Sequence, residues 1–320
     1  MKSYNENYLV FIFPDENAGA NYVPPLAYMH SIAHPHEITH CPLCGDGHYV
    51  VVGQFQIDAL IDQWVARYEF NPIADVYRGK ILEKRRCREC GLCFYNYHLP
   101  DSDELYERLS ATGKYYPSFR SEYGIVTEII EKSGAAALLE IGCGNGAFLE
   151  RIRHIVPVVM GSEYNTAAAQ ECAQRGLDVV TEDITKISRA FDVICHFEVL
   201  EHVFDTKKLM HDTLRLLEHG GRLIIGTPDP DGILSVNGNG CLNLPPHHQF
   251  DFSQQTFEYL ANMYSLKIVD YQKTELTYRH YAGYVQNLTG MPLATPDMSG
   301  FYETQKKYTG HSHVVVFEKI

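Results

Sequence analysis

Short apolar runs that alternate with helical segments characterise the second half of the chain. Leu138 to Ile141 is an apolar run that leads into three glycines and then into a helical pattern ending at Ile152. Further strands are predicted at 158–161, 178–181 and 191–197, with a helix at 167–175. Strands that alternate with helices in this way predict an α/β fold built on a parallel sheet.

The same reading extends the predicted elements in both directions. A helix, a Gly-Gly break and a strand are predicted over 214–227, and two last strands at 267–272 and 314–318. Ser253 is suited to cap a helix that runs through Phe257 and Leu260. Upstream, residues 57–70 have a helical pattern with one apolar face, made of Leu60, Ile61, Trp64 and Tyr68.

The glycines after the first of these strands indicate a nucleotide-like ligand. Gly142, Gly144 and Gly146 remove side chains where the backbone bends and where a ligand approaches the main chain. Read as Gly-x-Gly-x-x-Ala, ending at Ala147, the same residues fit the dinucleotide-binding fingerprint. Glu140 argues against that alternative, because a carboxylate is unfavourable beside a pyrophosphate and favourable beside a cationic amino acid moiety.

This motif resembles the first motif of the class I S-adenosylmethionine-dependent methyltransferases, which implies their Rossmann-like sheet and their cofactor. By that resemblance Glu163 would accept hydrogen bonds from the ribose hydroxyls. Asp183 and Ile184 would contact the adenine, and the segment from Phe197 to Val203 would lie beneath the methionine end. Each acid could instead be a solvated residue at a strand end. The predicted cofactor-binding residues are Glu140, Gly142, Cys143, Gly144, Glu163, Tyr164, Asp183, Ile184 and Phe197.

Two Cys-x-x-Cys pairs, each followed by glycine, form the second strong pattern. Two such knuckles suit a structural zinc ion with tetrahedral thiolate coordination. A disulfide oxidoreductase site is the competing interpretation. Cys93 is a spare thiol, and Cys143, Cys172, Cys195 and Cys241 are predicted to be free. The predicted metal ligands are Cys41, Cys44, Cys87 and Cys90.

Charge limits the partners that the chain can have. Lys84, Arg85, Arg86 and Arg88 surround Cys87 and could suggest RNA, but these cations also offset the charge of four thiolates. The whole chain carries 27 Lys and Arg against 40 Asp and Glu, a formal charge of -13, which disfavours nucleic acid. The sequence has no long uncharged apolar stretch and no signal-peptide pattern, so we expect a cytoplasmic protein with no membrane partner.

The predicted organisation has three parts. Residues 1–36 lack periodicity and are interpreted as an N-terminal arm, residues 37–104 as a zinc-binding module, and residues 105–320 as the methyltransferase domain. A tyrosine-rich connection after the zinc module includes Tyr115 and Tyr116, either of which could close the cofactor pocket or make an interdomain contact.

His247 and His248 follow the fifth predicted strand, and the resemblance implies that this edge of the sheet faces the acceptor. The surrounding segment is similar to that of zinc-bearing C-methyltransferases that modify deoxysugars, although His247 stands where that family has glutamate. A role in capping or packing is the alternative. A later stretch, 274–310, resembles an acceptor-side insertion and carries Tyr278. The candidate catalytic residues are His248, His247, His202 and Tyr116.

The sequence thus predicts methyl transfer from S-adenosylmethionine to a small polar acceptor such as a nucleotide-linked sugar. In such a transfer the enzyme aligns the acceptor with the methyl group, removes water and takes a proton where the acceptor requires it. One alternative is an RNA or protein methyltransferase that uses the zinc module for recognition. Another is a cofactor-binding scaffold without catalysis.

Overall fold

Ten strands in two sheets organise the chain in the computed structural model, which describes residues 36–113, 115–233, 235, 240–289, 291 and 293–320. All of the predicted N-terminal arm except His36 lies outside these residues. The elements with strand or α-helix geometry are β1 (Tyr49–Gln56), α2 (Ile57–Tyr68), β2 (Ile81–Cys87), β3 (Cys93–Tyr95), α3 (Asp103–Ala111), α4 (Ser121–Ser133), β4 (Ala137–Ile141), α5 (Ala147–Ile152), β5 (Val158–Ser162), α6 (Thr166–Gln174), β6 (Val179–Val180), β7 (Phe191–Phe197), α7 (Thr206–Leu216), β8 (Leu217–Pro228), α9 (Gln254–Met263), β9 (Leu266–Lys273), α10 (Tyr278–Thr289), α11 (Met298–Gln305) and β10 (Ser312–Lys319). Short 3₁₀ turns are η1 (Asp75–Tyr77), η2 (Ile184–Lys186) and η3 (Cys241–Asn243).

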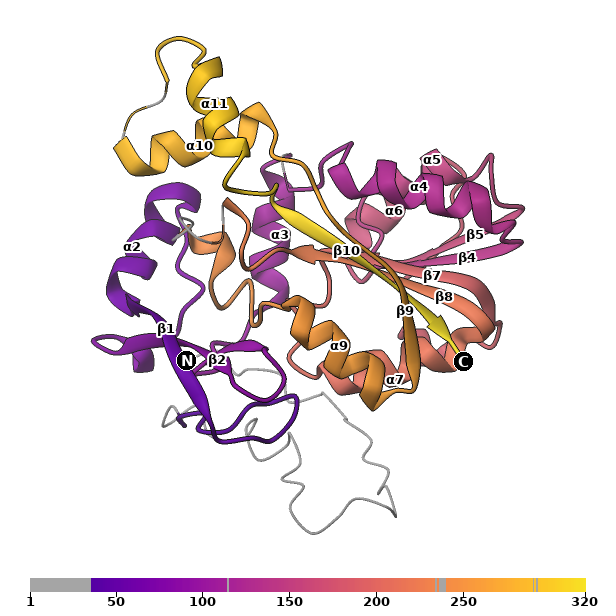
Figure 1. Ribbon diagram of the computed structural model, residues 1–320, viewed down its shortest axis with the longest axis horizontal. Coiled ribbons are helices and arrows are strands. Elements are labelled where there is room, and N and C mark those ends of the chain that lie inside the picture. Colours follow the sequence, from indigo (N-terminus) through magenta and orange to yellow (C-terminus); the bar gives the residue numbers. More distant parts are fainter. Residues whose placement is uncertain (1–35, 114, 234, 236–239, 290, 292) are drawn as a thin grey trace, which may run out of the picture.

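The larger sheet has seven strands in the order β6-β5-β4-β7-β8-β10-β9, and it spans the right half of Figure 1. β6, β5, β4, β7 and β8 are parallel, whereas β10 runs antiparallel to both β8 and β9. The predicted α/β, Rossmann-like sheet with a final antiparallel strand is therefore confirmed. This strand order brings the carboxyl ends of β4, β5 and β7 to one edge, where open α/β sheets bind ligands.

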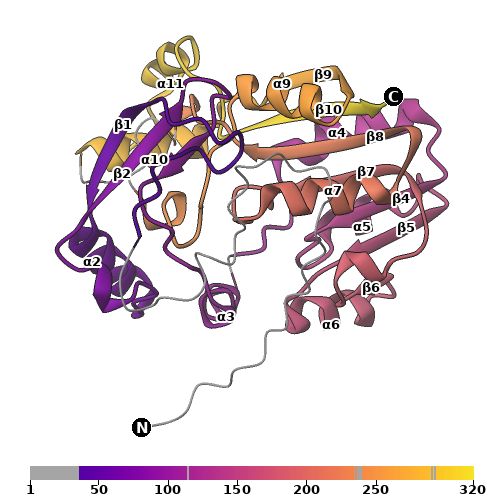
Figure 2. The same cartoon turned by 90° about the horizontal axis from the view of Figure 1, so that it is seen from below.

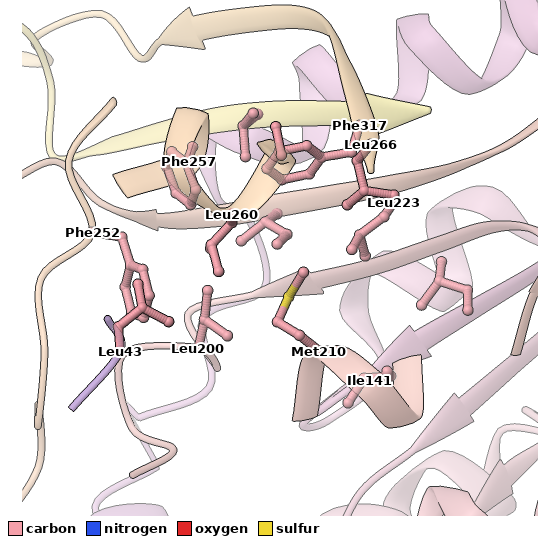
Figure 3. Packing of buried hydrophobic residues seen from close by; sticks show 14 of the residues in the cluster. Leu43, Ile141, Leu200, Met210, Leu223, Phe252, Phe257, Leu260, Leu266 and Phe317 are labelled. Carbon is pink, nitrogen blue, oxygen red and sulfur yellow. The ribbon is translucent and has the colours of Figure 1, made fainter. Parts of the chain in front are cut away.

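Alternating side chains along the strands bury both faces of this sheet. In β10, Val314 and Val316 join a core with α4 and α5, while Val315 and Phe317 join the core beneath α7 and α9. Successive side chains in a strand point to opposite faces, so one strand serves both cores. Figure 3 shows the second core, with Phe257 and Leu260 of α9 above Met210 of α7.

The smaller sheet, β1-β2-β3, packs with α2 beside the large sheet, as Figure 2 shows on its left side. α2 buries Ile57, Leu60, Ile61 and Trp64, which confirms the predicted apolar face, although Tyr68 is only half-buried. The smaller sheet is also attached to the segment before α9, because Cys93 of β3 forms an isolated β-bridge with Asp251.

One predicted boundary differs from the structure. The Gly-Gly pair at 220–221 does not separate the helix from the strand, because β8 already begins at Leu217. β7 pairs first with Leu217 and then with Arg222, so the residues between them form a bulge. Gly220 has φ 74°, and a Cβ on Gly221 would lie 2.8 Å from the carbonyl oxygen of Glu218. The glycines thus make the bulge possible inside the strand.

Candidate active site

A cavity of about 620 Å³ lies at the carboxyl ends of β4 and β7. The glycine loop after β4 and a group of histidines both line this cavity. The cavity brings together most of the predicted site residues. Those that line it are Glu140, Gly142, Cys143, Gly144, Phe197, Tyr116, His202, His247 and His248.

The glycine loop has a backbone that side chains would not fit. Gly142, Gly144 and Gly146 have φ of 68°, 52° and 73°. A Cβ on Gly142 would lie 2.6 Å from Val199, and one on Gly144 would lie 2.6 Å from the ring of Tyr116. The loop is fixed to β5, because the amides of Gly142 and Cys143 both donate to the carbonyl oxygen of Ser162, at 2.8 and 3.0 Å. Such a loop leaves main-chain atoms open to a ligand.

Glu140 lies at the base of the cavity on β4. Its side chain is buried, and within the described residues its Oε2 has no hydrogen-bond partner. Burial raises the pKa of Glu140 well above its usual range. A buried carboxylate without a partner is unfavourable unless a donor or a cation pairs with it, so this oxygen suits the cationic amino group of S-adenosylmethionine.

Glu163 lies beside the glycine loop, at the end of β5. Its Oε2 accepts from the amide of Gly144 at 2.7 Å, and its Oε1 accepts from the amide of Asn165 at 2.8 Å. Each carboxylate oxygen can accept a second hydrogen bond, so ribose hydroxyls fit these residues. Tyr164 is 69% exposed, and Asp183 accepts from the amide of Thr185 at 2.8 Å.

Three histidines from two segments meet at the same cavity. The ring centroids of His202, His247 and His248 are 4.4 to 4.8 Å apart. His202 Nδ1 lies 2.7 Å from the carbonyl oxygen of His247, and His247 Nδ1 lies 2.8 Å from that of Leu242. A carbonyl only accepts, so both Nδ1 atoms carry hydrogen and both Nε2 atoms keep a lone pair.

Burial keeps these imidazoles uncharged. It lowers the pKa of His202 to about 4, and together with neighbouring imidazoles it lowers the pKa values of His247 and His248 well below the ordinary value. Their ring nitrogens therefore offer lone pairs at neutral pH, but they are weak bases.

The two predicted tyrosines close the cavity from the connection between β3 and α4. The Tyr115 hydroxyl donates to His247 Nε2 at 2.9 Å, and the Tyr116 ring rests on the glycine loop. Tyr115 thus contacts the histidines, while Tyr116 contacts the predicted cofactor loop. The interpretation of these tyrosines as pocket residues agrees with their position, since both line the cavity.

A cluster of charged side chains that the sequence did not predict also lines this cavity. Glu198, after β7, lies 3.8 Å from Arg120 and 3.7 Å from His311, measured between ion-pair atoms. Burial would raise the pKa of Glu198, but His311 and Arg120 outweigh it and hold the value at about 2. Glu198 has φ 55°, a strained conformation for a non-glycine residue that often marks a functional site. Arg120 and His311 lie far apart in the sequence, so only the fold brings them together.

The predicted insertion contributes one residue to the cavity, Arg279 of α10. Two of its tyrosines form hydrogen bonds within the insertion instead. The Tyr278 hydroxyl oxygen accepts from the backbone amide of Asp297 at 2.8 Å, and the Tyr281 hydroxyl donates to the Asp297 carboxylate at 2.6 Å. α10 and α11 thus form a small core of their own around Phe301.

The four predicted metal ligands meet in one cluster away from the cavity. Their sulfur atoms lie within 4.8 Å of one another. Cys41 Sγ is 3.5 Å from Cys90 Sγ, and Cys44 Sγ is 3.5 Å from Cys87 Sγ. Tetrahedral zinc with Zn–S bonds of about 2.3 Å places sulfurs about 3.8 Å apart, so the donor set and spacing fit this ion.

Three of the basic residues near Cys87, namely Lys84, Arg85 and Arg86, are paired within the protein. Lys84 Nζ lies 2.8 Å from Asp251, and Arg85 forms ion pairs with Glu37 and Glu83. Arg86 lies 3.5 Å from Asp231. These pairings leave the run a poor surface for phosphate groups. Among the described residues, no helix combines the length and apolar character needed to cross a membrane.

The sequence model of a family described as "Methyltransferase domain" matches residues 95–271. Among curated relatives, a ubiquinone biosynthesis O-methyltransferase of Brucella anthropi is 32% identical over 99 residues, which are 28% of this chain and 40% of that protein. One with the same name from Klebsiella pneumoniae (strain 342) is 28% identical over 133 residues, 38% of this chain and 55% of that protein. The chain therefore spans about half the length of the curated relatives it matches.

Solved structures share less sequence. The plantazolicin methyltransferase BpumL in complex with a pentazolic desmethylPZN analog and SAH is 16% identical, with a TM-score of 0.47 over 68% of this chain and 92% of that one. The YcgJ protein from Bacillus subtilis is 15% identical, with a TM-score of 0.44 over 62% of this chain and 97% of that one.

The family match covers more than half of the chain, and it includes the glycine loop, Glu163 and the three histidines. The chain belongs to the class I S-adenosylmethionine-dependent methyltransferases.

Proposed function

We propose that this chain transfers the methyl group of S-adenosylmethionine to a small polar acceptor that binds between the glycine loop and the three histidines. The observation that carries the proposal is the cavity itself, which the glycine loop and the three imidazoles line together. When bound, S-adenosylmethionine supplies an activated methyl group with its own leaving group. The protein's task is then to bind, align and dehydrate the two reactants.

The proposed cofactor contacts follow the wall of the glycine loop. Glu140 would receive the amino group of the methionine end, and Glu163 the ribose hydroxyls. Tyr164, Asp183 and Ile184 would hold the adenine, beyond the cavity and next to Glu163. The backbone at Gly142, Cys143 and Gly144, with Phe197, would form the floor. Glu140 supports this assignment because its Oε2 is buried and without a partner among the described residues.

The proposed acceptor wall consists of His202, His247 and His248, with Tyr116 between it and the cofactor loop. His248 lines a second cavity as well, and this supports the assignment. A further cavity of about 420 Å³, lined by Arg86 and Asp231 among others, also reaches His248. An acceptor larger than the methylated group could extend into this space, between β1, β2 and the loop after β8. That geometry supports a contribution of the N-terminal module to the acceptor site.

The acceptor atom that we propose is a hydroxyl oxygen. The name of the curated relatives, ubiquinone biosynthesis O-methyltransferase, supports oxygen over carbon. The charged side chain of Arg279, which lines the larger cavity, supports a polar acceptor, and a nucleotide-linked sugar is one that meets both conditions. Methylation of RNA or protein is the second candidate, but the internal ion pairs of Lys84, Arg85 and Arg86 disfavour nucleic acid.

We also propose that the N-terminal module, residues 37–104, holds one structural zinc ion through Cys41, Cys44, Cys87 and Cys90. Four thiolates complete the coordination of zinc and leave no position for substrate. None of the four cysteines lines either cavity described above, which supports a structural role. The boundary with the methyltransferase domain, 105–320, would fall inside α3, whose Leu105 and Leu109 pack with Trp64 of α2.

Incubation of the purified chain with metabolite extracts and isotopically methyl-labelled S-adenosylmethionine tests the proposed function. Mass spectrometry should find a small polar metabolite that gains one labelled methyl group, with equimolar S-adenosylhomocysteine. The alternatives give other results. Label in RNA or protein would favour the macromolecular acceptor, and cofactor binding without any labelled product would favour a scaffold without catalysis.

A further inference from the structure

The three histidines of the acceptor wall have the arrangement of a metal-binding site. Each offers a ring nitrogen, and these atoms lie within 4.8 Å of one another. Two of the imidazoles are fixed by hydrogen bonds from Nδ1 to backbone carbonyl oxygens, at 2.7 Å for His202 and 2.8 Å for His247. A ligating histidine characteristically donates its other ring N–H in this way, which orients the lone pair of Nε2 toward the metal.

A buried carboxylate completes the group. Glu201 is 0% exposed, and within the described residues neither of its carboxylate oxygens has a hydrogen-bond partner. Its Oε1 lies 3.7 Å from His202 Nε2 and 4.0 Å from His248 Nε2. A carboxylate buried in this way is strongly unfavourable unless a cation compensates it. Neutral imidazoles do not supply that charge, whereas a metal ion between them would.

The two segments that carry these residues are held together before any ion binds. The backbone carbonyl of Glu201 accepts from the amides of Gln249 and Phe250, at 2.8 and 3.2 Å. The side chain of Gln249 donates in turn to the carbonyl oxygens of Leu99 and Pro246. The ligand atoms are therefore positioned by the backbone of both segments, and metal binding would not need to order them.

We propose that His202, His247, His248 and Glu201 bind a first-row divalent transition-metal ion, a second site distinct from the four cysteines. Imidazole and carboxylate ligands suit Zn²⁺, Fe²⁺ and Co²⁺, while the cysteine cluster is a thiolate site. The histidines line the cavity and Glu201 does not. The carboxylate thus approaches from the protein side, and an ion that expands to five-coordinate geometry would have a further coordination position toward the cavity.

This further position gives the ion a role that rests on the proposed function. An acceptor hydroxyl bound there would be acidified, because a divalent cation lowers the pKa of a coordinated oxygen acid. The histidines would then act by holding the cation, in keeping with their low basicity, and the proton of the coordinated hydroxyl would pass to solvent water, so no imidazole would need to take it. The Tyr115 hydroxyl lies 2.9 Å from His247 Nε2, the proposed ligand atom. Binding of the ion would therefore replace the hydrogen bond between these two atoms.

Cobalt binding by the full chain tests the proposal without cofactor or acceptor. After mild chelation that leaves the thiolate site filled, titration with Co²⁺ should give one equivalent of visible d–d absorption. The thiolate-to-cobalt charge-transfer band should be absent, because the ligands are nitrogen and oxygen. The proposal is overturned if no such equivalent binds, or if the bound ion shows thiolate charge transfer.

Variants locate the bound ion. The double variant His247→Gln/His248→Gln should lose the nitrogen-ligated equivalent, and Glu201→Gln, which keeps the side-chain volume, should weaken Co²⁺ binding at least tenfold. The matched control is His98→Gln, because His98 is a half-buried histidine whose pKa burial also lowers, to about 4, but whose ring stacks on that of Phe204 with 3.9 Å between centroids. Co²⁺ affinity equal to wild type in both site variants would contradict the proposal.

Calorimetry with S-adenosylhomocysteine separates this inference from the proposed function. If the cofactor product binds but Co²⁺ does not, the metal site is wrong and the methyltransferase proposal stands. If Co²⁺ binds to the histidines but the product does not bind, the metal site stands and the proposed function is wrong.

Discussion

Two glutamates near the glycine loop carry the same chemical group in different surroundings. Glu163 accepts hydrogen bonds from two backbone amides, which fixes its carboxylate and leaves lone pairs free. Glu140 is buried, and one of its oxygens lacks a partner among the described residues. The first is prepared to accept hydroxyl donors, and the second needs a cationic partner. This difference at single residues supports the ribose and amino assignments.

Replacement of Glu163 should weaken binding of the cofactor. Glu163→Ala removes charge-assisted hydrogen bonds to both ribose hydroxyls, so we expect a loss of about 2 kcal/mol in S-adenosylhomocysteine binding. Isothermal calorimetry measures this change. Glu171→Ala, which removes an exposed acid from the neighbouring helix α6, is the control and should leave the affinity unchanged. Equal affinities for the wild type and Glu163→Ala would refute the ribose assignment.

Replacement of His248 should affect turnover and leave cofactor binding nearly intact. His248 belongs to the proposed acceptor wall and lines the same cavity as the glycine loop. We expect His248→Ala to lower the turnover of the identified acceptor by about a hundredfold or more, whether the imidazole acts directly or through a bound cation. Steady-state kinetics combined with calorimetry checks both parts. Wild-type turnover would move His202 and Tyr116, which also line the cavity, ahead of His248.

Among the elements, β7 has an unusual composition for a central strand, because it buries a histidine. His196 is 0% exposed, and within the described residues neither ring nitrogen has a hydrogen-bond partner. Burial lowers the pKa of His196 to about 4. In the unfolded chain a histidine titrates near 6.5, so between these values the unfolded state binds a proton that the folded state does not. Stability must therefore fall as the pH drops from about 6.5 to about 4.

Replacement of this histidine by an apolar residue should remove one proton from that pH dependence. As the pH falls from 6.5 to 4, the unfolding free energy of both proteins should decrease. We expect the decrease per pH unit to be about 1.4 kcal/mol smaller in His196→Leu than in the wild type. Urea unfolding at several pH values measures the slopes. His219→Leu, at an exposed position in the β8 bulge, is the control. A wild-type slope in His196→Leu would show that His196 is not the group that titrates.

The elements were predictable from sequence where their patterns are local. The strand at 138–141, the glycine loop and the Ser253 cap depend on neighbouring residues, and the capping box of α9 is present. The Gly-Gly bulge was not predictable, because it depends on how β8 pairs with β7. The same holds for the Glu198 group, since Arg120 and His311 approach it only through the strand order. Glu201 was not predictable for a similar reason, because the lack of hydrogen-bond partners for its carboxylate depends on the packing around it.

At the scale of the whole molecule, the proposed zinc site joins the N-terminal module to the large sheet. Leu43, between two of the cysteines, lies in the main core with Phe252 and Leu200, as Figure 3 shows. The second knuckle is attached to the start of α9, because Ser253 Oγ donates to the carbonyl oxygen of Gly91 at 3.2 Å. Both knuckles thus contribute to the surface that α9 covers, so the metal would support the methyltransferase core as well as its own module.

Zinc content and stability should therefore change together. The purified chain should hold one zinc ion in the cysteine site, and Cys87→Ser should lose that ion and lower the melting temperature, because metal binding to four thiolates stabilises the fold. Elemental analysis and thermal unfolding measure both. Cys93→Ser, at a buried thiol that is not in the cluster, should keep the zinc. Absence of zinc, or a disulfide within either pair under reducing conditions, would contradict the structural site.

The central claim is that the cofactor binds against the glycine loop, and calorimetric titration with S-adenosylhomocysteine tests it most directly. The wild type should bind one equivalent. Gly144→Ala should weaken binding at least tenfold, because its Cβ would lie 2.6 Å from Tyr116 and would fill the space beside the loop. Gly134→Ala is the matched control, because Gly134 also has a positive φ, 68°, but lies in open space at the end of α4. The account predicts wild-type affinity for this control. No binding by the wild type, or wild-type affinity in Gly144→Ala, would contradict it.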